Sequence, residues 1–255
     1  MAAVKILEKR LKVCWVCILF LCYGIGHSQT VNSLKLLDFR YGFQAPLADM
    51  KDRFGGNNAI GLGVEISSFK TNMIFGVEGI TMFGNNVKED VLAPLRTYDG
   101  NIIGIDNRPG DVNLKERGWY AGVFTGRIFK TTKHEGQLTG LRVQLGVGLL
   151  QHKIRVQDNY NSIVPLNKEY INGYDRLSNG PAIHFGLGYQ YDSPVNNFHF
   201  RIMGEVFGGK TKSRRDLDYA TGTYLSADRT DILYGLHIAY IVTISRTTSE
   251  EFIYY

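Results

Sequence analysis

The stretch DILYGLHIAYIVTIS, residues 231–245, alternates bulky apolar residues with smaller or more polar ones. The bulky positions share one parity: Ile232, Tyr234, Leu236, Ile238, Tyr240, Val242 and Ile244. A period of two places successive side chains on opposite faces of a β-strand, whereas a helix would need a period near 3.6. The stretch therefore predicts a strand with one bulky face. It raises the question of whether that face meets a protein core or lipid.

Seven further alternations of this kind follow residue 29, where we find no convincing amphipathic helix. The predicted strands span 36–44, 59–67, 73–83, 119–130, 141–157, 181–192, 198–209 and 230–246. The connections are alternately long and short, with long loops that include 84–118, 158–180 and 210–229. An up-and-down sheet with tight turns at one end and long loops at the other has this asymmetry. We therefore predict an all-β, eight-stranded antiparallel up-and-down barrel over residues 29–255.

The second face of the predicted strands decides how the barrel is oriented toward solvent. It is rich in glycine, as at Gly61, Gly63, Gly186 and Gly188, and we assign no lysine to its mid-strand positions. A soluble barrel would carry many charged residues on its solvated face. The interior of an eight-stranded barrel is just wide enough for side chains, which suits glycine and a few isolated charges. The glycine-rich face is thus predicted to line the interior, and the bulky face to meet lipid in a transmembrane β-barrel.

Charged residues on the inward parity balance one another. They are Asp38, Glu65, Glu78 and Glu205 against Arg40, Arg127, Arg142 and Arg201, and His184, His199 and His237 share the parity. Buried ions must be paired or they cost several kcal/mol each. The matched set predicts a salt-bridge network that plugs the lumen; the alternative is that some members lie near strand ends and are hydrated. Aromatic residues near both strand ends, Tyr120 and Tyr234 among them, are expected to face outward at the lipid boundaries.

Residues 1–28 form a separate segment with basic residues, the apolar run VCWVCILFLCYGIG and then small residues. This order is typical of a secretory signal peptide, and a single transmembrane anchor is the alternative. All three cysteines lie here, so the chain from residue 29 onward would contain no disulfide or thiolate site. Four basic residues and Glu8 also lie here, so only about +2 of the net charge of +5 would remain. We therefore expect no nucleic-acid partner.

The signal segment, the eight strands, the long loops and the Tyr-rich last strand together resemble the OmpA/OmpX-type small outer-membrane barrels. The start at Ser28-Gln29 and the EEFIYY ending are most similar to uncharacterised barrels of Bacteroidota. This resemblance implies an integral protein in the outer membrane of a Gram-negative bacterium with both termini periplasmic. It also implies contact with outer-membrane lipid and lipopolysaccharide, and with other outer-membrane proteins.

No motif in the sequence predicts a catalytic residue, a metal site or a cofactor. The GxG pairs lack the third glycine of a dinucleotide site, and the histidines have no metal-ligand spacing. His152, near the outer end of the fifth strand, is the only histidine placed for lipid chemistry. We therefore predict a non-enzymatic barrel that acts as a structural or interaction subunit in an outer-membrane export or assembly complex. A lipid-modifying enzyme and a minor pore are the alternatives.

Two groups of residues are predicted to make external contacts. Tyr170, Tyr174, Asp175 and Arg176 in loop 158–180 would touch a partner, because Tyr and Arg dominate interface hot spots. The alternative is that these aromatic residues pack against loop 84–118. Lys153, Arg155, Arg214 and Arg215 would contact lipopolysaccharide phosphates at the outer rim, with a hydrated rim as the alternative.

Overall fold

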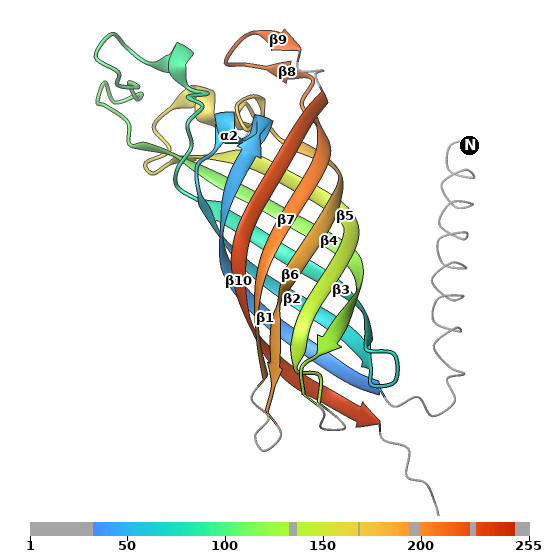
Figure 1. Cartoon of the computed structure of the whole chain (residues 1–255). Helices are drawn as coiled ribbons and strands as arrows, with labels where there is room; N and C mark the ends of the chain where they lie inside the picture. Colours follow the sequence, from blue (N-terminus) through green and yellow to red (C-terminus); the bar gives the residue numbers. More distant parts are fainter. Residues whose placement is uncertain (1–32, 133–136, 168, 194–198, 225–227, 248–255) are drawn as a thin grey trace, which may run out of the picture.

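A computed structural model describes residues 33–132, 137–167, 169–193, 199–224 and 228–247 (Figure 1), so the predicted signal peptide, residues 1–28, lies outside the described residues. Eight long strands form one closed barrel: β1 (Ser33–Ala48), β2 (Asn57–Ser68), β3 (Met73–Gly84), β4 (Val112–Lys130), β5 (Gly140–Asp158), β6 (Ser178–Asp192), β7 (His199–Ser213) and β10 (Asp228–Thr247). Each strand pairs antiparallel with its neighbours along the chain, and β1 pairs with β10 to close the ring. The predicted all-β, eight-stranded up-and-down barrel is confirmed.

Short elements occupy the long-loop end of the barrel. Helix α2 (Asp49–Arg53) follows β1, and the two-residue strands β8 (Leu217–Asp218) and β9 (Thr223–Tyr224) lie between β7 and β10. Three 3-10 turns complete this end: Ala93–Leu95, Val164–Leu166 and Ile171–Gly173. A five-residue helix is too short to show an amphipathic period, which explains why the sequence gives no sign of α2. Among the described residues no helix is long and apolar enough to cross a bilayer.

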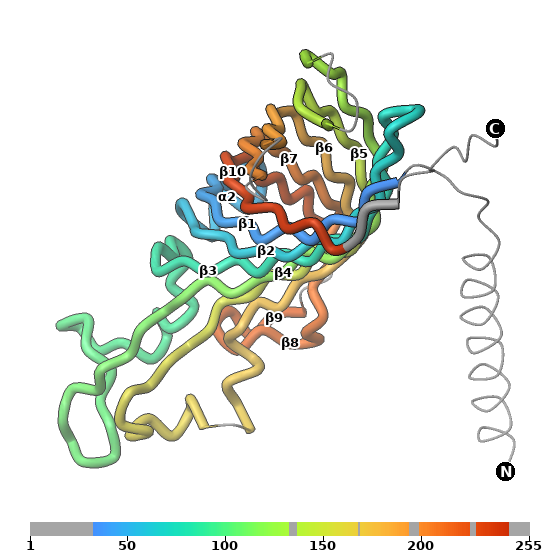
Figure 2. The backbone as a smooth tube through the Cα atoms, turned by 90° about the horizontal axis from the view of Figure 1, so that it is seen from below, coloured from blue at the N-terminus to red at the C-terminus, as the bar shows by residue number. Residues whose placement is uncertain are grey.

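The hairpin of β4 and β5 reaches beyond the rest of the barrel. Its register runs from Lys130↔Gly140 at the short turn to Val112↔Asp158 at the outer end. Figure 2 shows these outer ends projecting to one side of the ring. The prediction that β4 starts at residue 119 was wrong, because residues 112–118, VNLKERG, carry charges where the bulky outer face should continue. Lys115 and Arg117 project from the outward face of this extension, whereas Glu116 is buried on the opposite face.

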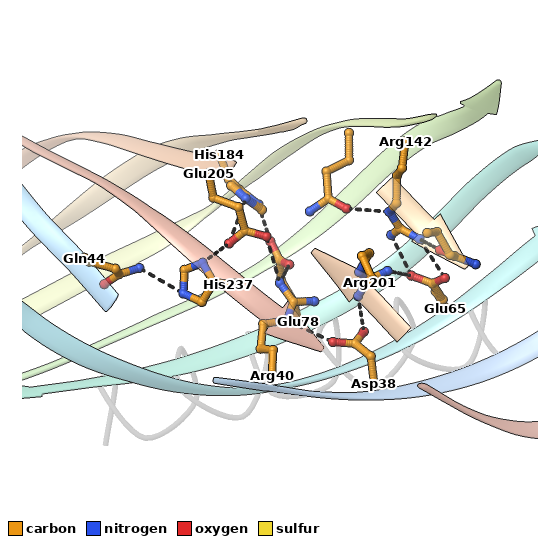
Figure 3. Close-up of polar contacts among 12 residues, drawn as sticks. Asp38, Arg40, Gln44, Glu65, Glu78, Arg142, His184, Arg201, Glu205 and His237 are labelled. Atoms are coloured by element: carbon orange, nitrogen blue, oxygen red, sulfur yellow. Dashed lines mark hydrogen bonds and ion pairs between the residues drawn. The ribbon is translucent and has the colours of Figure 1, made fainter. Parts of the chain in front are cut away.

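Three layers of side chains fill the interior. An apolar cluster near the short turns holds Leu34, Leu36, Ile74, Phe124, Ile128, Leu138 and Ile241. A charged layer follows at mid-height (Figure 3). A second apolar cluster begins above it with Tyr120 and Phe207 and continues outward to Leu92, Ile102 and Leu166 of the loops. The loops and the upper barrel therefore share one apolar core.

The expected orientation of β4 was wrong, and with it the placement of Tyr120 and Arg127. Tyr120 is 1% exposed inside the barrel, whereas Arg127 is exposed on the outer wall, where its guanidinium lies 5.7 Å from the centre of the Phe129 ring. The sequence WYAGVFTGRIF, residues 119–129, has bulky residues on both parities, so alternation alone is ambiguous. Glycines opposite β4 settle the orientation: a Cβ atom at Gly76 would lie 2.5 Å from Cζ of the inward-facing Phe124.

Gly76 and Gly79, both on β3, provide a matched test of this packing. We expect Gly76→Ala to destabilise the barrel by about 1–3 kcal/mol, since its Cβ would also lie 2.6 Å from the backbone oxygen of Val64. Gly79→Ala is the control, because its Cβ has no atom within 4 Å, and it should change stability by less than about 0.5 kcal/mol. Urea unfolding in detergent micelles measures both. Equal effects of the two substitutions would contradict the inward packing of Phe124.

Candidate functional site

An ion-pair network crosses the middle of the barrel interior (Figure 3). It joins seven of the eight charged residues that the sequence placed there, from five strands: Asp38 and Arg40 of β1, Glu65 of β2, Glu78 of β3, Arg142 of β5, and Arg201 and Glu205 of β7. Each of the seven is at most 5% exposed. Strand alternation explains their meeting, because all of them project from the face opposite the bulky one.

One half of the network is centred on Glu65. Its two oxygens accept bonds from Arg142 at 2.8 and 2.6 Å, in the fork geometry that makes such pairs strong. Arg201 Nη1 also reaches Glu65 at 3.1 Å, and its Nη2 lies 3.1 Å from Asp38. Two neutral amides complete the shell of Arg142: Gln144 accepts from Nε and Gln190 from Nη1, each at 3.0 Å. Glu65 is therefore shared between two buried guanidinium groups.

The other half is centred on Arg40. Its Nε donates to Asp38 at 2.9 Å, and its Nη1 donates to Glu78 at 2.8 Å and lies 3.5 Å from Glu205. His184 lies between the two glutamates, with Nδ1 2.5 Å from Glu78 and Nε2 3.6 Å from Glu205. Asp38 links the halves, because it contacts both Arg40 and Arg201.

The charges nearly cancel without Arg127. Four carboxylates face three guanidinium groups, and the His184 ring lies between two of the carboxylates. His237 Nδ1 adds a contact of 2.9 Å to Glu205. Two histidines thus lie beside the carboxylates of the network, where the sequence had also placed Arg127. The shared parity of His184 and His237 was the available signal.

The network is covered on its outer side by aromatic side chains. Phe207 stacks on the His184 ring, with centroids 4.3 Å apart and planes at 8°, and Tyr120 packs edgewise against both. Phe54, which follows α2, meets the His152 ring at 5.6 Å and 87°. The ionic layer is therefore closed toward the outside by an apolar layer.

His152, the residue on which the enzyme alternative depends, is fully buried. Its Nε2 lies 2.8 Å from Asp231, whose carboxylate also accepts from Thr211. All three side chains are 0% exposed. The pair therefore lies in the interior and not on the surface of the barrel. Within the described ranges, no group of three or more His, Cys, Asp or Glu residues is placed to hold a metal ion.

The external loops are tied to one another by charged residues. Arg176 pairs with Glu89 at 3.1 Å and with Asp218 at 2.9 Å, so it connects the loops that follow β3, β5 and β7. Arg53 of α2 donates to Glu89 at 2.9 Å and to the backbone oxygen of Arg176 at 3.0 Å. Together these contacts form an ordered cap over the barrel, which we call the outer cap and define as residues 49–56, 85–111, 159–177 and 214–224 within the described chain.

Three of the four residues predicted to touch a partner are buried in the outer cap. Tyr174, Asp175 and Arg176 are 4–8% exposed, and Tyr174 meets Tyr219 edgewise at 5.6 Å. Burial raises the pKa of the Tyr174 hydroxyl, as expected for a packed tyrosine. Their partners come from neighbouring loops, but mostly not from loop 84–118 as the alternative had it. Tyr174 and Asp175 contact Tyr219 and Arg215 of loop 210–229, and only Arg176 reaches loop 84–118, through Glu89. Only Tyr170, at 47% exposed, is available at the surface.

The four predicted rim cations fall into two groups. Lys153 and Arg155 lie on the outward face of β5. Arg215 instead holds Asp175 through bonds of 2.8 and 2.6 Å, which raise the pKa of its guanidinium, and Arg214 donates to the side chain of Asn179. Arg214 thus connects the outer cap to β6 and Arg215 joins two segments of the cap. Lys153 and Arg155 instead project from the outward face of β5, with Lys153 Nζ 3.9 Å from Asp175.

Comparisons with known proteins give no family for this chain: no family model and no curated protein matches the sequence. Three similar solved structures are outer-surface proteins. Ail of Yersinia pestis, in complex with the heparin analogue sucrose octasulfate, is 11% identical, with a TM-score of 0.40 over 82% of this chain and 99% of that one. Neisserial surface protein A is 9% identical, with a TM-score of 0.40 over 82% and 97% of the two chains. The outer membrane protein OprG of Pseudomonas aeruginosa is 13% identical, with a TM-score of 0.36 over 84% and 99%. Such distant similarities carry no argument about function, which must come from the residues of this chain.

Glu65 tests the dependence of the fold on ion pairing. Glu65→Gln should cost about 3–5 kcal/mol, because it leaves Arg142 without a carboxylate at 0% exposure. The double variant Glu65→Leu/Arg142→Met should unfold at higher urea than the single variant, since it removes the uncompensated charge. Asp99→Asn, in an exposed loop, is the control and should be neutral. If the double variant lost more stability than the two single substitutions lose when their effects are added, the pairing account would be contradicted.

Arg176 tests the outer cap separately from the barrel. Arg176→Ala should leave Glu89 and Asp218 without this partner and increase proteolysis of the loops in the folded protein, while the barrel keeps its heat-modifiable gel shift. Arg108→Ala, in the exposed tip of loop 85–111, is the control and should leave the digestion rate unchanged. If the barrel itself failed to fold in Arg176→Ala, the prediction would be wrong, because the ion pairs of the cap would then be required for folding of the barrel.

Proposed function

We propose that this protein is an integral outer-membrane barrel with a closed lumen, acting without catalysis as a structural or interaction subunit through its outer cap. The observation that carries the proposal is the lack of charge across most of the outer wall; Arg127, near the short turn after β4, is a charged residue at its edge. Across residues 39–43, 60–66, 75–83, 119–125, 141–149, 181–191, 202–206 and 234–244, no outward side chain is charged. A soluble protein rarely exposes a contiguous apolar surface of this extent.

Lipid explains the opposite polarities of the two faces. Outward residues such as Val147 (57% exposed), Ile183 (58%) and Ile238 (57%) would be solvated in a soluble barrel, while the charges inside would be deprived of water. A closed barrel also satisfies every backbone hydrogen bond between strands, which is the condition for crossing a bilayer with β-structure. Aromatic residues lie near both edges of the apolar band, with Trp119 and Tyr234 toward the loops and Phe129 and Tyr189 toward the short turns.

The proposed orientation places the outer cap outside the cell. Barrels of the outer membrane have short periplasmic turns and long external loops. In this chain the short turns follow β2, β4 and β6, and the first and last strands begin and end on the same side. Both termini would then be periplasmic, and a signal peptide over residues 1–28 would direct export.

The interior supports a barrel that neither conducts nor catalyses. The ionic layer lies between two apolar clusters inside the barrel, an arrangement that supports a closed lumen. Function is therefore assigned to the outer cap, whose surface exposes Tyr98, Ile105, Tyr160 and Tyr224. Exposed aromatic residues on an ordered scaffold suit contact with another outer-membrane protein, such as a component of an export or assembly complex, and cations at the rim suit lipopolysaccharide.

The lipid-facing wall is tested by Leu145→Arg. Leu145 lies in the middle of the apolar band on β5 and should cost about 2–4 kcal/mol when replaced by arginine at the bilayer midplane. Leu145→Phe is the control and should be tolerated, because lipid accommodates another apolar side chain. The readout is urea unfolding in phospholipid vesicles. If Leu145→Arg did not lower the free energy of unfolding, the wall would face water.

The assigned role is tested with the full-length protein expressed in a Gram-negative host. We expect no stable channel in planar bilayers, and we expect a specific protein to co-purify after gentle solubilisation. Tyr98→Ser/Ile105→Ser/Tyr160→Ser should abolish that co-purification while the barrel still folds, and Ile60→Val, on the wall, should not. Stable conductance would support the pore alternative. If co-purification survived the triple substitution, the outer cap would not be the surface that contacts the partner.

A further inference from the structure

Four cations form a compact grid on the outward face of the β4–β5 hairpin. Lys115 pairs in register with Arg155, and Arg117 pairs with Lys153. Residues two apart on a strand share a face, so all four side chains project from the same side of the sheet. Cross-strand neighbours lie about 4.5–5.5 Å apart at their Cβ atoms, and like charges placed in this way repel one another.

Internal anions do not neutralise this grid. Lys115 Nζ donates to the amide oxygen of Gln157 at 3.0 Å, and Arg117 donates to the backbone oxygen of Glu116 at 2.6 Å, so both acceptors are uncharged. The carboxylate closest to Lys153 is that of Asp175, at 3.9 Å, and Arg215 already binds that carboxylate with two hydrogen bonds.

The remaining acidic groups of the hairpin point elsewhere. Glu116 is 0% exposed on the opposite face, where it accepts from Asn57. Asp158 binds the backbone amides of Tyr160 and Ile163, and Asp111 binds Asn113 and Asn159 at the far end of the hairpin. Among the described residues, Arg155 has no carboxylate partner. The grid therefore presents an excess of positive charge outward.

The height of the grid on the wall identifies its ligand. Trp119, which pairs with Gln151, is the last aromatic residue of the apolar band on β4, and the Arg117↔Lys153 pair is the next outward-facing pair. Tryptophan marks the boundary between the hydrocarbon and headgroup regions. Cations one and two outward-facing pairs above it lie at the depth of lipid headgroups, where phosphate groups are available for charge-assisted hydrogen bonds.

We propose that Lys115, Arg117, Lys153 and Arg155 form a binding site for the phosphorylated headgroup of an outer-leaflet lipid, held against the β4–β5 wall with its acyl chains on the apolar band below. This inference rests on the proposed function, since it requires the wall to face lipid. It assigns lipid recognition to one side of the barrel, the β4–β5 hairpin, and removes Arg214 and Arg215 from it. Repulsion within the grid is relieved when the phosphate binds.

The experiment uses the full-length protein in nonionic detergent, titrated with diphosphoryl lipid A and followed by native mass spectrometry. We expect Lys115→Gln/Arg155→Gln to weaken binding by about tenfold per cation removed. Lys51→Gln/Lys70→Gln removes the same charge from exposed positions outside the grid and should bind like the parent. Dephosphorylated lipid A should bind the parent as weakly as the diphosphoryl lipid binds the grid variant.

A second measurement separates recognition from a general loss of stability. In detergent without phosphate, Lys115→Gln/Arg155→Gln should unfold at the same or a higher urea concentration than the parent, because like-charge repulsion is removed. With diphosphoryl lipid A present the order should reverse.

Three results would overturn the site. The first is that the grid variant binds the lipid like the parent, and the second is that the dephosphorylated lipid binds as tightly as the diphosphoryl lipid. The third is that inorganic pyrophosphate displaces the lipid at equal concentration, because the site would then belong to a soluble anion. Flotation with vesicles distinguishes these failures from failure of the proposed function. A parent protein that does not float refutes membrane insertion itself, whereas normal flotation with unchanged lipid binding refutes only the site.

Discussion

The structure depends on the exclusion of charge from most of the outer wall of the barrel. A chain whose apolar residues face outward must place its ionic groups inside, where each one has to find a partner within a lumen the width of its own side chains. The network around Glu65 and Arg40 meets this condition by sharing: Glu65 serves two guanidinium groups, and Asp38 joins the two halves. Glycines on the inward face leave the space that these long side chains occupy.

This solution for the lumen determines where function can lie. The lumen holds paired ions beneath a layer of aromatic side chains, and His152 is buried among them, which is the basis for proposing a barrel that neither conducts nor catalyses. What remains available is the outer cap and the extended β4–β5 hairpin, which the chain stabilises with a continuous apolar core and with Arg176. Order in these loops, rather than length alone, suits them to present a defined surface. The same hairpin changes from an apolar outer face to a cationic one at Trp119, which is the change that the proposed lipid headgroup site requires.

Sequence reasoning succeeded where one face is uniformly bulky and the other uniformly small, as in residues 231–245, and it located seven of the eight predicted charges in the lumen. It failed on β4, where Trp119 and Tyr120 compete for the outer face and only the glycine at position 76 on the adjacent strand resolves the parity. It also failed on Tyr174 and Arg176, because their partners Tyr219, Glu89 and Asp218 come from loops distant in sequence. Strand alternation is a local pattern in the sequence, whereas contacts between loops produce no periodic pattern that could be recognised.

The inverted arrangement of the two faces can be measured directly on β5. All cysteines of the chain lie within residues 1–28, so in a protein that begins at residue 29 single cysteines placed in turn at residues 141–149 can be spin-labelled specifically. In bilayers, labels at odd positions should collide frequently with oxygen, which concentrates in lipid, and labels at even positions should be protected from both oxygen and a water-soluble nickel complex. Accessibility to nickel at the even positions would reveal a water-filled lumen and contradict the account, as would accessibility to nickel at the odd positions, which would place the wall in water.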